Sequence, residues 1–146
     1  MEVFRKMTEA DVDAVAELEK EIFSDAWTSK SIYETFCQQQ AFIAVAEENG
    51  EIAGYCIVYY VMDEGEIARI AVNPQKQRRG FGRHLLDYSS FLCREKGVAR
   101  LLLDVRESNE TAKRFYENYG FTEDGVRRNF YQMPTENAVL MSKNIG

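Results

Sequence analysis

The segment from residue 41 to residue 62 most constrains what this chain can fold into. Two apolar runs, Ala41–Glu47 and Ile52–Met62, are separated by Glu48-Asn49-Gly50. Asn-Gly accepts the positive φ angles of a tight hairpin turn, so the segment predicts two antiparallel strands. The fold is therefore expected to contain a β-sheet with this hairpin near its start.

Helix and strand patterns alternate through the rest of the chain. Further strands are predicted at Val3–Arg5, Glu66–Val72, Leu101–Val105, Phe121–Arg128 and Ala138–Lys143. Helices are predicted after Thr8, Thr28, Gly82 and either Ser108 or Asn109, with Gly97 and Gly120 ending the last two. The nearly continuous apolar run Leu101–Val105 is typical of a central strand buried on both faces. This order predicts an α/β sandwich around a mixed sheet.

Composition and charge exclude several classes of function. The 146 residues fit one domain, residues 1–146, and 45% hydrophobic residues can form a core. A net charge of −6 argues against binding nucleic acid through its phosphates. The first residues lack a signal-peptide core and no apolar run could span a membrane, so a cytoplasmic location is expected. Cys37, Cys56, Cys93 and the single histidine, His84, lack the spacing of a zinc site, so reduced thiols and no metal are expected.

The loop at residues 77–83 is the most basic part of this acidic chain and joins a strand to a helix. Its charge comes from Arg78, Arg79 and Arg83, with Lys76 just before it. The first turn of a helix presents free N–H groups and partial positive charge, which bind phosphates. Glycines at positions 80 and 82 let a phosphate approach the backbone. The plainer alternative is a glycine turn followed by a solvated basic helix start.

Known nucleotide motifs restrict the interpretation of this loop. GxxxxGK[ST] is absent, and GxGxxG fails because Leu85 occupies the third glycine position. The pattern [Q/R]xxGx[G/A] remains, and it resembles the pyrophosphate loop of the GNAT superfamily of N-acetyltransferases. Four more segments match that superfamily in order: Ile67–Pro74, Leu103–Asn109, Phe115–Phe121 and Arg127–Tyr131. Together they resemble its RimI branch, the ribosomal-protein-alanine N-acetyltransferases, over nearly the whole chain.

The resemblance implies a fold, a cosubstrate and a partner. The fold would be a three-layer αβα sandwich with a mixed, mostly antiparallel central sheet. The cosubstrate would be acetyl-CoA, and the partner a protein N-terminus, with an N-terminal alanine of a ribosomal protein as the typical target. The backbone of Ile70, Ala71 and Val72 would hold the pantetheine arm, and the Val72 amide would polarise the thioester carbonyl. The pyrophosphate would be held by the loop residues Arg78, Arg79, Gly80, Phe81, Gly82 and Arg83, and the pantetheine would also bond Asn109.

The resemblance further implies catalytic roles, with one departure from the family pattern. Tyr116 matches the general acid that protonates the leaving thiolate, although its place in an aromatic helix stripe also fits a core residue. The general-base position holds Asp104 instead of glutamate, which withdraws the carboxylate by about 1.5 Å. Asp104 would therefore act through water, or Glu66 would replace it. Asp104 could also be a structural carboxylate paired with Arg100 or Arg106.

Other residues and functions stay open at the level of sequence. His84 is expected at the surface or the cofactor rim. Trp27 and Tyr131 would line the amine groove by analogy with the family, or pack as partly buried aromatics. A second enzymatic possibility is acetylation of a small amine or of a lysine side chain. A third is a CoA-binding module without turnover, which the presence of Tyr116 and Asn109 disfavours.

Overall fold

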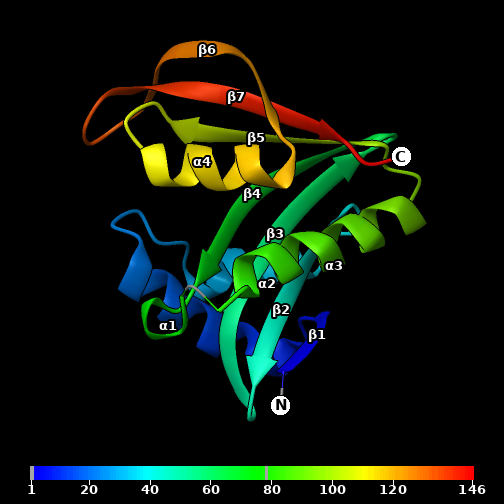
Figure 1. The fold of residues 1–146 in the computed structure, drawn as a ribbon. Helices are drawn as coiled ribbons and strands as arrows, with labels where there is room; N and C mark the ends of the chain where they lie inside the picture. Colours follow the sequence, from blue (N-terminus) through cyan, green and yellow to red (C-terminus); the bar gives the residue numbers. More distant parts are fainter. Residues whose placement is uncertain (1, 78) are drawn as a thin grey trace.

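The computed structural model describes residues 2–77 and 79–146, and the statements below concern those residues. Seven strands and four α-helices follow one another along the chain (Figure 1). Their bounds are β1 Glu2–Lys6, α1 Val12–Ile22, α2 Ser29–Phe36, β2 Ala41–Glu48, β3 Glu51–Val61, β4 Glu64–Val72, α3 Phe81–Glu95, β5 Arg100–Arg106, α4 Glu110–Tyr119, β6 Thr122–Tyr131 and β7 Glu136–Asn144.

The strands form one sheet in the order β1-β2-β3-β4-β5-β7-β6. Every neighbouring pair is antiparallel except β4 and β5, which are parallel. The sequence therefore predicted correctly a mixed, mostly antiparallel sheet with a hairpin near its start. The parallel pair is short: it joins Glu64–Glu66 to Arg100–Leu102 and no further. Figure 1 shows β4 and β5 diverging beyond this contact.

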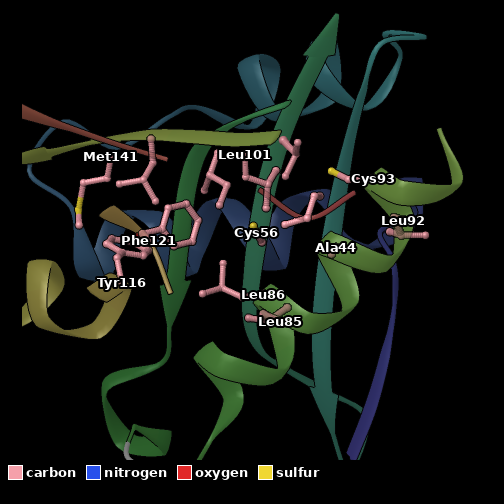
Figure 2. Close-up of a cluster of buried hydrophobic side chains, with 14 of the residues drawn as sticks. Ala44, Cys56, Leu85, Leu86, Leu92, Cys93, Leu101, Tyr116, Phe121 and Met141 are labelled. Atoms are coloured by element: carbon pink, nitrogen blue, oxygen red, sulfur yellow. The ribbon is translucent and has the colours of Figure 1, made fainter. Parts of the chain in front are cut away.

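Helices cover both faces of the sheet, so the fold is the expected three-layer αβα sandwich. One core cluster lies between the sheet and the helices α3 and α4; it includes Cys56, Leu85, Leu101, Tyr116 and Phe121 (Figure 2). The other lies between the sheet and α1 and α2, around Val15, Ile32, Val45 and Tyr55. Burial of these apolar side chains is the main force that holds the layers together.

Turn and capping residues in the sequence mark several of the observed element boundaries. The hairpin turn has Asn49 at φ 52° and Gly50 at φ 86°, the backbone that Asn-Gly favours. The Thr28 hydroxyl accepts the Ser31 N–H at the start of α2, and the Asn109 side chain accepts the Ala112 N–H at the start of α4. The choice left open between Ser108 and Asn109 therefore falls on Asn109.

The burial expected for β5 was wrong on one face. Residues 101, 103 and 105 are buried against α3 and α4, but residues 100, 102, 104 and 106 are only partly buried. Apolar residues at both kinds of position suggested helices on both sides. Instead, Leu102 lines a cavity on the face where α1 and α2 do not reach.

Candidate active site

The separation of β4 from β5 leaves one edge of β4 without a strand partner. Residues 67–72 continue beyond the last paired residue, Glu66, and lie against β3 only. The Asn73 N–H donates to the Ala53 carbonyl oxygen across β3, at 2.8 Å. Because N–H directions alternate along a strand, Val72 directs its own N–H and C=O to the open edge. The amide predicted to polarise the thioester therefore faces the space between the two strands.

Close packing of β3 against β4 fixes the position of this edge. Gly54 lies opposite Val72, and a Cβ atom on Gly54 would stand 2.7 Å from the Ala71 carbonyl oxygen. Only glycine allows this approach of two backbones. Of the three residues predicted to hold the pantetheine arm, Ile70 and Val72 thus direct their backbone groups to the open edge, whereas those of Ala71 face Tyr55 of β3.

The predicted pyrophosphate loop leads directly into α3. Gly80 adopts the left-handed conformation, φ 84°, immediately before the helix. In the described chain, no acceptor is found for the amides of residues 81–83, as expected of a first helical turn. Gly82 faces Val72 and Phe115, and a Cβ there would stand 3.1 Å from Phe115 Cζ. The donors therefore lie beside the open edge of β4, an arrangement that fits a pyrophosphate joined to a pantetheine arm.

The charges of this loop are less free than the sequence suggested. Glu48, at the end of β2, forms ion pairs with Lys76 at 2.7 Å and with Arg79. These contacts hold the pKa of Glu48 below its usual value. Arg83 is exposed, and Arg78 lies outside the described residues. Two of the four predicted basic side chains are thus held by a carboxylate 28 and 31 residues away in sequence.

Both candidate bases line one cavity of about 360 Å³ on the face of β5 that the helices leave open. Glu66 is exposed at its rim, and Asp104 is half-buried. Phe130 and Arg127, from β6, lie on the same cavity. Burial raises the pKa of the Asp104 carboxyl above its ordinary value, and the positive charge of Arg127 partly offsets this shift. A raised pKa brings a carboxylate closer to the range in which a general base works.

Asp104 is not the structural ion-pair partner considered from the sequence. Arg100 pairs with Glu64 and Asp124, and Arg106 pairs with Glu136. Neither arginine forms an ion pair with Asp104 in the described structure. The carboxylate is therefore available for chemistry in the cavity.

Tyr116 combines the two alternatives considered for it. Its ring is buried in the core, at 9% exposure, with edge contacts to Phe115 and Phe121 (Figure 2). Burial raises the pKa of its hydroxyl. No hydrogen-bond partner for that hydroxyl occurs among the described side chains. Core packing thus fixes the ring while the hydroxyl remains a free donor, which is what an acid for the leaving thiolate requires.

The remaining predicted site residues also have defined positions. Asn109 is exposed, and its Oδ1 accepts the Ala112 N–H at 3.1 Å, which leaves its Nδ2 as the side-chain donor for a ligand. His84 is exposed as expected, with its ring edge-on to Phe4 at 5.6 Å. Tyr131 is partly buried, and burial together with the Asp104 charge raises its pKa to about 12. Trp27 lines a second cavity, of about 470 Å³, beside Tyr59.

Sequence analysis missed the Glu19–Arg69 ion pair beside this second cavity. Glu19, on α1, is fully buried and accepts hydrogen bonds from Arg69 Nε and Nη2 at 2.9 and 3.1 Å. The only sequence signal was negative: Arg69 interrupts an apolar strand, where a charge requires a partner. Nothing in the sequence identifies that partner, which lies 50 residues away.

No three side chains of His, Cys, Asp or Glu gather as a metal ion would require, within the part of the chain that the structure describes. None of the described helices is long and apolar enough to cross a membrane.

The central strands of this sandwich part beside the start of α3, and the model of the acetyltransferase (GNAT) family matches residues 12–121. The chain belongs to this family, which defines its class: it is an acetyl-CoA-dependent N-acetyltransferase. That family uses acetyl-CoA.

Individual relatives cover nearly the whole chain. The ribosomal protein bS18-alanine N-acetyltransferase of Escherichia coli K12 is 33% identical over 146 residues, covering 97% of each chain. The enzyme of the same name from Haemophilus influenzae is 34% identical over 145 residues, covering 97% of this chain and 98% of its own. The crystal structure of the ribosomal-protein-S18-alanine N-acetyltransferase from E. coli superimposes with a TM-score of 0.92 at 32% identity. It covers all of this chain and 95% of its own.

Proposed function

We propose that the protein transfers the acetyl group of acetyl-CoA to the free α-amine of a protein N-terminus, and that the acceptor is an N-terminal alanine of a ribosomal protein. The proposed acceptor is supported by relatives named for this substrate, which match the chain nearly from end to end at 33% and 34% identity. Because ribosomal proteins are made in the cytoplasm, the proposed activity would be cytoplasmic. We assign it to one domain, residues 1–146.

The open edge of β4 would bind the acetyl donor. Strand-like hydrogen bonds from Ile70 and Val72 to the pantetheine amides would extend the sheet where β5 has separated. The Val72 N–H would then face the thioester carbonyl oxygen, where a fixed donor stabilises the charge that develops on attack. The α3 amides at residues 81–83 would hold the pyrophosphate.

The cavity of Glu66 and Asp104 would receive the acceptor. An amine attacks only when neutral, and a free α-amine with a pKa of about 7.7–8.0 needs modest help near neutral pH. Asp104 is the better candidate for the base, because it is half-buried, has a raised pKa and forms no ion pair among the described residues. The shorter side chain of aspartate suits transfer through one water molecule. Tyr116 would protonate the leaving thiolate.

Thiol release from acetyl-CoA tests the proposal directly. The purified protein is given a short peptide that begins with a free alanine, and the same peptide with a blocked N-terminus serves as the control. Release with the free peptide alone supports α-amine acetylation. Release with both peptides, when they contain lysine, points to the side-chain amine. Binding of CoA without release from either peptide, or from small amines, would leave a CoA-binding module.

A further inference from the structure

We propose that the Glu19–Arg69 ion pair is a positioning device: it fixes residues 23–28 as one wall of the acceptor groove and thereby sets the KM for the acceptor peptide. Residues 23–28, called here the acceptor segment, connect α1 to α2. The inference rests on the proposed function only in naming the acceptor. The ion pair and its contacts stand independently of it.

The carboxylate of Glu19 is the centre of the arrangement. Besides its two bonds from Arg69, it accepts the Tyr55 hydroxyl at 2.6 Å and the Trp27 backbone N–H at 2.8 Å. The Glu19 side chain that accepts these four bonds is 0% exposed. A buried charge with one partner removed is strongly destabilising, so the four donors hold one another in place through this carboxylate.

Arg69 connects the same carboxylate to the acceptor segment a second time. Its Nη2 donates to the Asp25 carbonyl oxygen at 3.1 Å and lies 3.3 Å from Asp25 Oδ1. Its guanidinium stacks over the Phe23 ring, 3.8 Å from the centroid, and lies 5.9 Å from the Trp27 ring. Three of the six residues in the segment are therefore bound to one ion pair.

A bulge in β4 aims Arg69 at α1. Ile57 pairs with Arg69 and the next residue, Val58, pairs with Ile67, so Ala68 is an extra residue. Ile67 packs toward α3, whereas Ile57 opposite Arg69 packs toward α1. The extra residue changes the side of the sheet on which the following side chains lie. Arg69 thus faces Glu19, while Ile70 and Val72 keep their place on the edge proposed for acetyl-CoA.

The acceptor segment lies where the acceptor would enter. Trp27 lines the cavity of about 470 Å³ together with Tyr59. Tyr59 pairs with Glu66 across β3 and β4, and Glu66 pairs with Leu102 across β4 and β5. Glu66 and Leu102 line the cavity of the candidate bases, so one row of the sheet joins the two cavities. A displaced segment would misplace the acceptor while leaving the acetyl-CoA edge intact.

The test replaces the ion pair by apolar side chains, because such a replacement commonly preserves folding where a single change would strand a buried charge. The double variant Glu19→Leu/Arg69→Met removes the hydrogen bonds that the two side chains make to the acceptor segment. We expect kcat/KM for the alanine peptide to fall about 10- to 100-fold, chiefly through KM, because a small misplacement of a reactant has effects of this size. The Kd for acetyl-CoA should stay within about twofold of wild type.

The chain offers a matched control. The Asp11 carboxylate accepts hydrogen bonds from two nitrogens of Arg5, at 2.7 and 3.0 Å, and from the Thr8 backbone N–H at 2.8 Å. This pair also joins a strand to the α1 region, but the strand is β1, and β2, β3 and β4 lie between it and β5. The variant Arg5→Met/Asp11→Leu should alter thermal stability without changing the KM for the peptide. An equal rise of KM in both double variants would show a general loss of order and overturn the proposal.

Trp27 provides a readout that does not depend on turnover. It is the only tryptophan in the chain, so its fluorescence reports on the acceptor segment. Increased quenching by acrylamide in the Glu19→Leu/Arg69→Met protein, at unchanged far-UV circular dichroism, is the expected result. An unchanged KM with unchanged quenching overturns the inference. A wild-type protein that acetylates no peptide would count against the proposed function, and the quenching experiment would still decide whether the ion pair orders the segment.

Discussion

Glu66 pairs with Leu102 at the last point where β4 and β5 are in register, and both side chains border the cavity that also holds Asp104. Two carboxylates therefore share one space at the fork of the sheet, but in different surroundings. Glu66 is exposed, whereas Asp104 is half-buried with a raised pKa. This difference yields a prediction about which of them is the base.

The variant Asp104→Asn is expected to lower kcat about 100-fold or more, the usual contribution of a positioned base, while Glu66→Gln changes it less than about threefold. In the wild type, kcat/KM should rise with pH through the raised pKa of Asp104, and the asparagine variant should lose this rise. Steady-state thiol release between pH 5 and 9 measures both. Intact turnover in Asp104→Asn together with loss of turnover in Glu66→Gln would assign the role to Glu66.

The same substitution should make the protein more stable near neutral pH. A carboxyl whose pKa is raised by folding favours the folded state at low pH, and that advantage disappears as pH rises through the folded-state pKa. Asparagine has no charge to bury, so Asp104→Asn should melt at a higher temperature than wild type at pH 7. The difference should vanish below about pH 3.9, where aspartate is protonated in both states. Thermal melts at pH 3.5 and 7 provide the comparison.

Removal of the Tyr116 hydroxyl separates chemistry from packing. Tyr116→Phe keeps the aromatic contacts to Phe115 and Phe121, and the lost hydroxyl has no partner among the described residues. Stability should therefore be equal or higher, since no buried bond is broken. We expect kcat to fall about 100-fold with an unchanged Kd for acetyl-CoA. A wild-type rate in this variant would reduce Tyr116 to a core residue.

Glycine at position 54 is predicted to be required for the acetyl-CoA edge. The Cβ of Gly54→Ala would collide with the Ala71 carbonyl oxygen at 2.7 Å, and neither backbone can move without shifting a strand. Overpacking of this kind costs about 1–3 kcal/mol of stability. The Kd for acetyl-CoA should rise as well, because the displaced residues are those of the open edge. Gly125→Ala, where a Cβ meets nothing within 4 Å, is the matched control.

The three cysteines should differ in their reactivity toward thiol reagents. Burial raises the pKa of Cys56 and of Cys93 to about 12, and Cys37 is exposed. A thiolate is the reactive species, so a disulfide reagent at pH 8 should modify Cys37 alone in the native protein and all three after denaturation. Rapid reaction of two or three thiols under native conditions would contradict the packing shown in Figure 2.

The features that sequence predicted correctly are those set by neighbouring residues. Asn49-Gly50 and the Thr28 and Asn109 caps each depend on a few adjacent positions. The features it missed depend on contacts between distant segments. The pairing of Glu48 with Lys76 and Arg79, and that of Glu19 with Arg69, span 28 to 50 residues. The bulge at Ala68, which orients Arg69, leaves no local signature.

The burial of β5 was misjudged for a related reason. Leu102 is apolar, and periodicity alone cannot tell whether an apolar side chain meets a helix or an open cavity. At the site, the sequence placed Asp104, Tyr116 and the Gly80 loop by resemblance. Only the three-dimensional structure shows that Arg100 and Arg106 form ion pairs with carboxylates other than Asp104.

The brief contact between β4 and β5 also determines how the molecule should respond to deuterium. In the described chain, strand pairing across the middle of the sheet is confined to the three residue pairs from Glu64–Arg100 to Glu66–Leu102. Amides that face the open edge, such as that of Val72, have no strand partner in the described chain and should exchange early. A bound acetyl-CoA would span the fork between β4 and β5. Its binding should therefore slow amide exchange much more at the fork than along the fully paired strands β2 and β3.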